Sequence, residues 1–386
     1  MDDNKLKNKV GMLSFHESLS YGATLQCYAL QKTIRDMGFA SEFINFQRKK
    51  CAEFHQAQTQ PTLKDRVKRL AIKAAVKLQN VRLANNNASV ERTFREFKDQ
   101  YLSVGKEEYC SIRSLYTSDL KYDVYLTGSD QVWNPYNSVL QVYGLGFVPP
   151  QINTVSYAAS IGVSEIPDEK KATMHQALQG VRHLSCREYE GAKALSTLLG
   201  REVTTVLDPT LLLKKDEWRA LKAPMELPSK YVLCFFLGSL DYPREVAYKL
   251  AKQNGCELLV IPGSPKDVFT KGKIVKGCGP QQFLELFFNA AFVCTDSFHG
   301  TAFALNFNKP FFSFCRRGYH EKTSYISRIK DLLETVGLSD RLVYPESETD
   351  FAIPKIDFSA ANEILERERE RSLSYLHSAL SDEIKM

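Results

Sequence analysis

Short apolar segments alternate with longer amphipathic segments along most of this 386-residue chain. Before residue 210 the apolar segments fall at 9–15, 40–46, 122–127, 154–159, 183–186 and 203–207. The intervening segments, such as 21–37, 168–180 and 188–200, carry apolar residues at helical spacing. Strands that alternate with helices are typical of parallel sheets covered by helices, so the pattern predicts an α/β fold.

The alternation is interrupted by residues 222–230 (KAPMELPSK), whose two prolines are typical of a linker. It then resumes with apolar segments at 231–237, 257–261, 292–295 and 310–314. A chain of this length exceeds what one hydrophobic core usually supports. We therefore expect two Rossmann-like domains, residues 1–225 and 226–386, facing each other across a cleft. A charged helix over residues 360–380 is expected to pack back on the first domain.

The first domain is expected to carry a basic helical insertion at residues 61–100. Between Pro61 and Arg82 there are seven basic residues and one acid, and apolar residues recur at three- and four-residue steps. Two interpretations remain open: a helix that docks on its own domain with its basic face in solvent, which we favour, or an interfacial helix on anionic lipid. Nucleic-acid binding is disfavoured, because basic and aromatic residues are not interleaved on strands.

Several classes of protein are disfavoured by composition. The nine cysteines form no CxxC pair, and the histidines and acids lack the spacing of metal ligands, so we expect neither a disulfide scaffold nor a metal site. The sequence has no run of 18 apolar residues. Its first 15 residues carry two acids and no long apolar segment, so we expect no secretory signal. We expect a cytoplasmic protein, with peripheral contact at the inner face of the membrane if residues 61–82 bind lipid.

Polar residues follow the predicted strands where each strand ends. His16, Ser129, Ser160, Arg187 and Asp296 all lie at or near such positions. Taken singly, Ser and Asp there are most often helix caps. Ligands of open α/β sheets bind beyond the carboxyl ends of the strands, so five such ends in one chain favour a binding cleft.

The segment TDSFHGTAF, from Thr295 to Phe303, has the densest group of these residues. Asp296 could orient the imidazole of His299 or cap the helix, and we favour the cap. His299 is interpreted as a general acid or base near neutral pH, and Gly300 as room for a ligand. Asp130 could deprotonate an acceptor hydroxyl or cap the helix that starts at Gln131, and we favour the cap.

Seven segments follow one another along most of the chain: SYGATLQCYALQKTIRDMGF, YDVYLTGSDQVWNP, SYAASIG, SCREYEGAKAL, VLDPTLLL, DSFHGTAFALNFNKPF and SRIKDLLETVGLSDR. In this order they resemble the polysaccharide pyruvyl transferase family. Two positions depart from the family pattern: Ser20 replaces an asparagine, and Ser297 stands where many members have an arginine.

The resemblance implies a GT-B-like fold and transfer of a pyruvyl group from phosphoenolpyruvate to two hydroxyls of one sugar, which gives a cyclic ketal and phosphate. It implies no cofactor beyond phosphoenolpyruvate as co-substrate, and a glycan acceptor that is a polysaccharide or its lipid-linked precursor. Arg187 matches the donor-binding arginine, although pairing with Glu188 or Glu190 is an alternative. Arg316, Arg317, Lys322 and Arg328 are candidates to replace the missing arginine.

The predicted site residues fall into three groups. The expected catalytic residues are His299, Arg187 and Asp130. The expected donor-binding residues are Arg187, Ser297, His299, Gly300, Lys322 and Arg328. The expected acceptor-binding residues are His16, Tyr21, Gly22, Ser129 and Gln131. Two rival hypotheses are a GT-B glycosyltransferase that uses a nucleotide sugar and a non-catalytic partner in envelope polysaccharide assembly.

Overall fold

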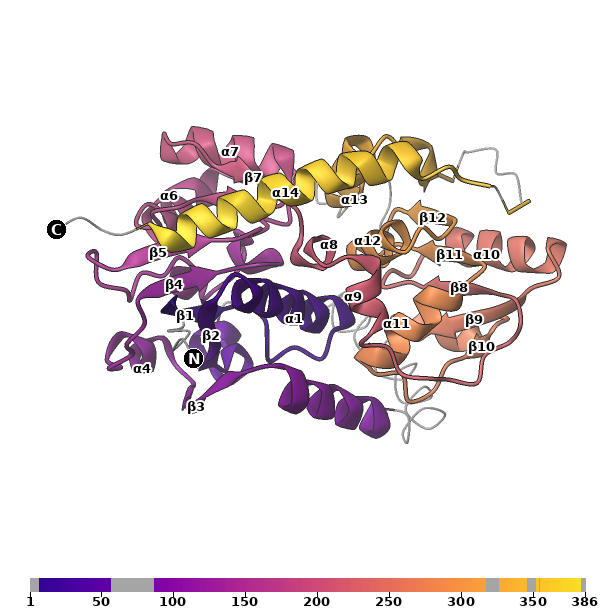
Figure 1. Cartoon of the computed structure of the whole chain (residues 1–386), viewed down its shortest axis with the longest axis horizontal. Helices are drawn as coiled ribbons and strands as arrows, with labels where there is room; N and C mark the ends of the chain where they lie inside the picture. Colours follow the sequence, from indigo (N-terminus) through magenta and orange to yellow (C-terminus); the bar gives the residue numbers. More distant parts are fainter. Residues whose placement is uncertain (1–6, 57–86, 317–325, 346–351, 354, 383–386) are drawn as a thin grey trace, which may run out of the picture. The chain divides into compact units, whose positions relative to one another are not determined.

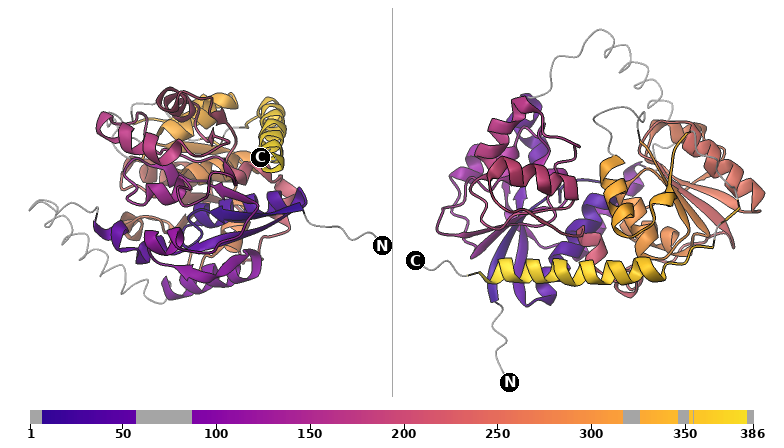
Figure 2. Two further views of the ribbon diagram at one scale, coloured as in Figure 1. Left: turned by 90° about the vertical axis from the view of Figure 1, so that its left-hand side faces the viewer. Right: turned by 90° about the horizontal axis from the view of Figure 1, so that it is seen from above.

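The computed structural model describes residues 7–56, 87–316, 326–345, 352–353 and 355–382 (Figures 1 and 2). The chain forms two compact units. Unit 1 comprises Met1–Gln58, Lys98–Leu213 and Leu365–Met386, and unit 2 comprises Thr59–Phe97 and Lys214–Ile364.

Unit 1 is built on a parallel five-stranded sheet of order β3-β2-β1-β4-β5 (Figure 1). The strands are β1 (Lys7–Leu13), β2 (Phe39–Phe46), β3 (Val104–Tyr109), β4 (Val124–Thr127) and β5 (Asn153–Ser156). A two-stranded parallel sheet adds β6 (Ser185–Cys186) and β7 (Thr204–Thr205). The strand order reverses between β1 and β4, and such a switch point is where open α/β sheets bind ligands.

The main helices of unit 1 connect these strands. They are α1 (Tyr21–Asp36), α6 (Asp168–Leu178), α7 (Tyr189–Leu199) and α8 (Pro209–Leu212). A further helix over residues 87–101 lies mostly in unit 2, which includes its residues up to Phe97. Shorter turns are η1 (Arg48–Lys50), α2 (Ala52–Gln56), α4 (Ile112–Tyr116), η2 (Gln131–Trp133) and α5 (Leu140–Tyr143).

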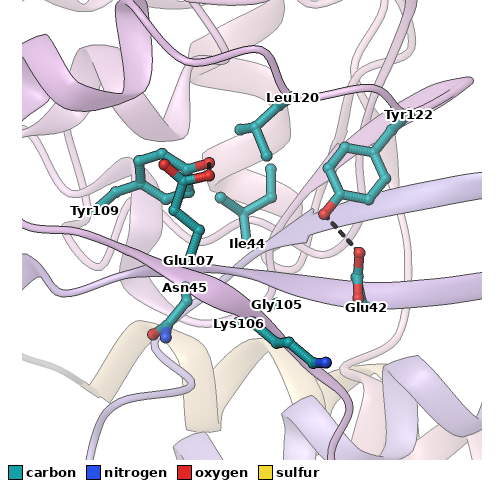
Figure 3. A pocket seen from close by; sticks show the side chains of 9 residues that line it. All are labelled: Glu42, Ile44, Asn45, Gly105, Lys106, Glu107, Tyr109, Leu120 and Tyr122. Carbon is teal, nitrogen blue, oxygen red and sulfur yellow. Dashed lines mark hydrogen bonds between the residues drawn. The ribbon is translucent and has the colours of Figure 1, made fainter.

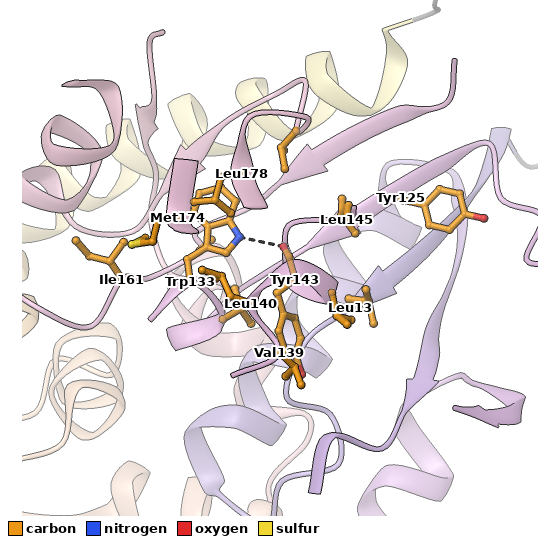
Figure 4. Packing of buried hydrophobic residues seen from close by; sticks show 14 of the residues in the cluster. Leu13, Tyr125, Trp133, Val139, Leu140, Tyr143, Leu145, Ile161, Met174 and Leu178 are labelled. Atoms are coloured by element: carbon orange, nitrogen blue, oxygen red, sulfur yellow. Dashed lines mark hydrogen bonds between the residues drawn. The ribbon is translucent and has the colours of Figure 1, made fainter. Parts of the chain in front are cut away.

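Trp133 lies at the centre of the unit 1 core and fixes the short turn that follows β4 (Figure 4). Its side chain is fully buried, and its indole Nε1 donates to the carbonyl of Tyr143 over 3.0 Å. Met174 and Leu178 of α6 belong to the same apolar cluster. An anchored indole therefore holds η2, and with it the residues just before it, against the core.

Unit 2 repeats the architecture with a parallel six-stranded sheet of order β10-β9-β8-β11-β12-β13. The strands are β8 (Tyr231–Phe235), β9 (Glu257–Ile261), β10 (Lys273–Ile274), β11 (Phe292–Thr295), β12 (Phe311–Phe314) and β13 (Leu342–Val343). The helices are α9 (Lys215–Arg219), α10 (Tyr242–Gln253), η3 (Pro265–Phe269), α11 (Pro280–Asn289), α12 (Phe298–Asn306), α13 (Ile326–Thr335) and η4 (Ser339–Arg341). The switch point of this sheet lies between β8 and β11.

The long helix α14 (Ser359–Ser381) contributes its residues from Leu365 onward to unit 1. Ser372 Oγ accepts from the amide of Leu207 over 2.9 Å, and the Tyr375 hydroxyl donates to the carbonyl of Ser156 over 3.1 Å. Asn153 Nδ2 donates to the carbonyl of Ala379 over 2.8 Å. The predicted packing of the last helix on the first domain is confirmed.

The predicted α/β class with two Rossmann-like domains is confirmed by the two parallel sheets. The strand predicted over 183–186 is shorter, since β6 holds only Ser185 and Cys186. The basic helix predicted between Pro61 and Arg82 falls outside the described residues. Within the described part of the chain, no helix is long and apolar enough to cross a membrane.

Candidate functional site

Gln26 of α1 ties together the two strand ends at the switch point of unit 1. Its Nε2 donates to Ser14 Oγ over 2.9 Å, just beyond β1. Its Oε1 accepts from the amide of Ser129 over 3.3 Å, just beyond β4. A single buried amide thereby fixes the spacing between the segments that carry His16 and Asp130.

The backbone after β4 and β5 adopts conformations that are rare for residues with a side chain. Asp130 has φ 66° and Ala158 has φ 50°, both in the left-handed region. Strained non-glycine residues of this kind cluster at functional sites. Asp130 precedes η2 but its side chain makes no capping hydrogen bond. The interpretation of Asp130 as a helix cap is therefore wrong.

Arg187 forms the centre of a buried ion cluster. Its Nη1 donates to Asp208 Oδ2 over 2.8 Å and its Nε donates to Glu188 Oε1 over 3.1 Å. The side chain is 2% exposed, and Nη2 lies 3.8 Å from Asp130 Oδ1. Burial alone would lower the pKa of Arg187, but Glu188, Asp208 and Asp130 outweigh it and raise that pKa above its usual range.

Hydrogen bonds extend the cluster to neighbouring segments. Ser129 Oγ donates to Asp208 Oδ2 over 3.2 Å, and Ser160 Oγ donates to Glu188 Oε1 over 2.6 Å. Asp208 also caps α8, where it accepts from the amide of Thr210 over 2.9 Å. The strand ends that carry Ser129, Ser160 and Arg187 are therefore joined through one guanidinium and its carboxylates.

The pairing of Arg187 with Glu188, considered as an alternative, is what the structure shows. Adjacent residues inside a helix do not face each other, which would disfavour this pairing. Glu188 is not inside the helix, however: it is the N-cap of α7 and has an extended backbone, with φ −98° and ψ 137°. Counting Arg187 as one positive charge and Asp130, Glu188 and Asp208 as three negative charges, the cluster has an excess of two negative charges. The donor contact predicted for Arg187 stays a prediction.

The predicted acceptor residues near β1 are buried. His16 is 4% exposed, its Nδ1 lies 3.3 Å from the carbonyl oxygen of Ser14, and its ring stacks on Phe43 with centroids 5.5 Å apart. Burial lowers the pKa of His16, which favours the neutral imidazole. Tyr21 and Gly22 are buried in the first turn of α1.

Gln131 lies against Gly162, which has a φ of 66°. A Cβ atom on Gly162 would come within 2.5 Å of Gln131 Oε1, so the glycine permits a close approach. Asn134 Nδ2 donates to the same oxygen over 3.1 Å. The structure thus brings Gln131 and the Ser160–Gly162 segment together.

In unit 2, Asp296 and Ser297 follow β11 and have different partners. The Asp296 carboxylate accepts from the amides of Leu237 and Gly238 over 2.7 and 2.8 Å, beyond β8. Ser297 is the N-cap of α12, and its Oγ accepts from the amide of Gly300 over 3.4 Å. The cap predicted at Asp296 is therefore wrong: Asp296 joins the two strands of the switch point instead.

His299 and Gly300 lie in the first turn of α12. His299 is 8% exposed. A Cβ atom on Gly300 would come within 2.4 Å of Thr295 Oγ1, so this glycine accommodates the Thr295 side chain. The interpretation of Gly300 as room for a ligand does not fit that contact.

Arg316 is the candidate cation that lies beside the switch point of unit 2. A Cβ atom on Gly238 would come within 2.8 Å of Arg316 Cγ. Burial raises the pKa of Asp296, while the positive charge of Arg316 and the two amides oppose that rise. Arg328 is buried in α13, and Arg317 and Lys322 fall outside the described residues.

The family model described as polysaccharide pyruvyl transferase matches residues 21–314. The chain belongs to this family. Polysaccharide pyruvyl transferases are enzymes, and the matched range includes Asp130, Arg187, Asp208 and His299. A comparison with curated protein sequences gives no match.

Solved structures that are similar to this family member over most of both chains include the following three. UDP-GlcNAc 2-epimerase from Neisseria meningitidis, bound to UDP-GlcNAc, is 10% identical with TM-score 0.46, covering 93% of this chain and 98% of its own. Arabidopsis thaliana UGT89C1, complexed with quercetin, is 12% identical with TM-score 0.44, and the match covers 98% of this chain and 95% of the UGT89C1 chain. E. coli heptosyltransferase WaaC with ADP is 12% identical with TM-score 0.39, and the match covers 93% of this chain and 99% of the heptosyltransferase chain.

Sequence reasoning missed a pocket of about 320 Å³ on β2 and β3 of this family member (Figure 3). Its lining includes Glu42, which accepts from the Tyr122 hydroxyl over 2.9 Å, and Glu107, which accepts from the Tyr109 hydroxyl over 2.9 Å. The predicted site residues are not among its lining residues. Little in the sequence pointed to it, because β3 (VGKEEY) is a charged edge strand without apolar alternation.

Proposed function

We propose that the chain transfers a pyruvyl group from phosphoenolpyruvate to two hydroxyls of one sugar in a cell-surface polysaccharide or its lipid-linked precursor. The observation that carries this proposal is the family match over residues 21–314, which includes Asp130, Arg187 and His299. The products are a cyclic pyruvate ketal and inorganic phosphate.

The reaction begins with protonation of the methylene carbon of the donor, which makes C2 electrophilic. One sugar hydroxyl attacks C2 and loses its proton, and the C2–oxygen bond to phosphate breaks. The second hydroxyl then attacks C2 and loses its proton to close the ketal. The two hydroxyl protons balance the one gained by the new methyl group and the one carried by hydrogen phosphate.

The charges of unit 1 support an acceptor role for its switch point. The two-charge negative excess around Arg187 favours groups that donate hydrogen bonds, such as sugar hydroxyls, over phosphate. Asp130 is the outermost carboxylate, with its side chain 18% exposed, and we assign it as the base. His16, Tyr21, Gly22, Ser129 and Gln131 complete the proposed acceptor side, with Arg187 positioning Asp130.

The donor is assigned to unit 2, at the amino end of α12. The positive end of a helix dipole favours anions, and phosphoenolpyruvate carries both a carboxylate and a phosphate. His299 is the proposed general acid, and Arg316 is the proposed cation that replaces the family arginine at Ser297. A role for Lys322 or Arg328 at the donor stays a prediction.

Donor choice is tested by thermal unfolding with phosphoenolpyruvate or UDP-glucose, followed by assay of phosphate release with glycan acceptors. We expect stabilisation by phosphoenolpyruvate alone, and a new ketal methyl signal in the proton NMR spectrum of the acceptor. Stabilisation by UDP-glucose would favour a glycosyltransferase. No donor binding and no phosphate release would favour a non-catalytic partner in envelope assembly.

A further inference from the structure

A groove of about 690 Å³ runs along α10 in unit 2 (α10 is labelled in Figure 1). It is bordered by α10 on one side and by η3 with Thr270 and Lys271 on the other. A volume of this size lies within the range of small-molecule sites. Asp296, Ser297 and His299 are not among its lining residues, so the groove is distinct from the proposed donor site.

Two ion pairs join the two walls of this groove, α10 and η3. Lys266 Nζ of η3 lies 2.6 Å from Asp241 Oδ2 at the start of α10. Arg244 Nε donates to Asp267 Oδ1 over 3.0 Å, and Arg244 is 8% exposed. Both pairs link α10 to η3, so the two walls are held together before any ligand arrives.

Aromatic rings line the groove between these charges. Phe269 is 70% exposed, an unusual position for a large apolar side chain. Tyr248 is partly buried, and Lys271 Nζ lies 4.7 Å from the centroid of its ring. The groove therefore offers apolar ring faces next to an ammonium group.

The charge of the lining is positive. Beyond the two ion pairs, the lining carries Lys249, Lys252 and Lys271 together with one acid, Glu245. Three positive charges and one negative charge leave an excess of two positive charges. A ligand that matches this groove has an apolar face and at least one negative charge.

We propose that the groove binds a carboxylate-bearing sugar, and that its ligand is the pyruvate-ketal sugar of the product glycan. The identity of the ligand rests on the proposed function. A ketal sugar presents an apolar methyl group and ring C–H groups that fit Phe269 and Tyr248, and a carboxylate that fits Lys252 and Lys271. The groove would hold the product polymer on unit 2 outside the proposed donor site.

Saturation-transfer NMR titrations of the full chain test this assignment. The probes are a methyl glucoside carrying a pyruvate ketal, methyl glucuronide and unmodified methyl glucoside. We expect the ketal probe to bind most tightly, with saturation strongest at its methyl group, and the neutral glucoside to bind weakest. UDP is included to detect general binding of anions.

Groove variants separate this site from any other that binds the probe. Phe269→Ala should weaken binding of the ketal probe roughly fivefold and lower the saturation of its methyl group. Lys252→Glu with Lys271→Glu should weaken it by about tenfold, since each exposed ion pair contributes up to about fivefold. Lys276→Glu, at an exposed position outside the lining, is the matched control and should leave binding unchanged.

The proposal is overturned if the neutral glucoside or UDP binds as tightly as the ketal probe, or if the groove variants bind it like the wild type. The probe is prepared chemically, so binding does not depend on turnover. Ketal binding in the groove without pyruvyl transfer would refute the proposed function and leave an acidic-sugar site. Pyruvyl transfer without ketal binding in the groove would refute the groove assignment alone.

Discussion

Arg187 Nη1 lies 2.8 Å from Asp208 Oδ2, and their side chains are 2% and 0% exposed. A buried pair of this kind is costly to break, because the guanidinium stays buried after it loses its nearest carboxylate. The contact therefore links the fold of unit 1 to the position of Asp130, which lies 3.8 Å from the same guanidinium.

Asp208→Ala should lower the free energy of unfolding by about 3 to 5 kcal/mol. The substitution removes the nearest carboxylate partner of Arg187 and also removes the cap of α8. Urea unfolding followed by circular dichroism measures the change. Asp119→Ala is the matched control, because the Asp119–Lys121 pair has a similar separation of 2.9 Å but side chains that are 85% and 81% exposed. Asp119→Ala should lower the free energy of unfolding by no more than about 1 kcal/mol. Equal decreases in the two variants would contradict the assigned role of the buried cluster.

Gly128→Ala should destabilise the protein by about 4 kcal/mol or more. Gly128 has φ 122°, and a Cβ atom there would come within 2.0 Å of the backbone oxygen of Tyr157. Gly38→Ala is the control, because Gly38 has φ 88° but no atom within 4 Å of the added Cβ. The control should cost only about 1 to 2 kcal/mol, the usual penalty of a left-handed conformation. Thermal and urea unfolding compare the two, and a milder effect at Gly128 than at Gly38 would show that the β4 end can relax.

The free energy of unfolding should decrease as the pH is lowered, and part of this decrease should depend on His16. Burial lowers the pKa of His16 in the folded state, so the unfolded chain binds a proton more readily. The stability that this histidine contributes is present above its unfolded pKa of 6.5 and is lost as the pH falls from there toward the lower folded pKa. In urea unfolding between neutral and mildly acidic pH, His16→Gln should lose less stability than the wild type. Parallel curves for the two proteins would show that His16 does not titrate differently in the two states.

His299→Ala should lower turnover by roughly 10²–10⁴-fold, the usual contribution of general acid catalysis. The measurement is phosphate release from phosphoenolpyruvate with a glycan acceptor, alongside the melting temperature. His175→Ala, which removes an exposed histidine of α6, is the control. Near-normal turnover in a folded His299→Ala variant would exclude His299 as the acid.

The sequence was sufficient to predict the α/β class and the polar residues at the strand ends, because apolar strands and helical spacing are local patterns. Its prediction that Asp296 caps α12 is wrong, because aspartate and serine are both good caps and residue type does not show which of the two neighbours takes that role. The structure decides through position: the Asp296 carboxylate reaches the amides beyond β8, a segment almost 60 residues earlier.

The ion cluster of unit 1 was only partly predictable. Arg187 and Asp130 are predicted as site residues at strand ends, whereas Asp208 lies within the segment VLDPTLLL and has no predicted role. Its role depends on burial and on contact with Arg187, which is 21 residues away along the chain. The polar strand β3 was missed for a similar reason, since pairing with β2 stabilises it without apolar alternation.

The contacts of α14 affect the order in which the protein can be completed during synthesis. The backbone amide of Leu207 and the carbonyls of Ser156 and Leu211 find partners on Ser372, Tyr375 and Arg369. Those partners leave the ribosome only after all of unit 2 has been made. Domains usually fold in the order of synthesis, but here the unit that begins first is finished last.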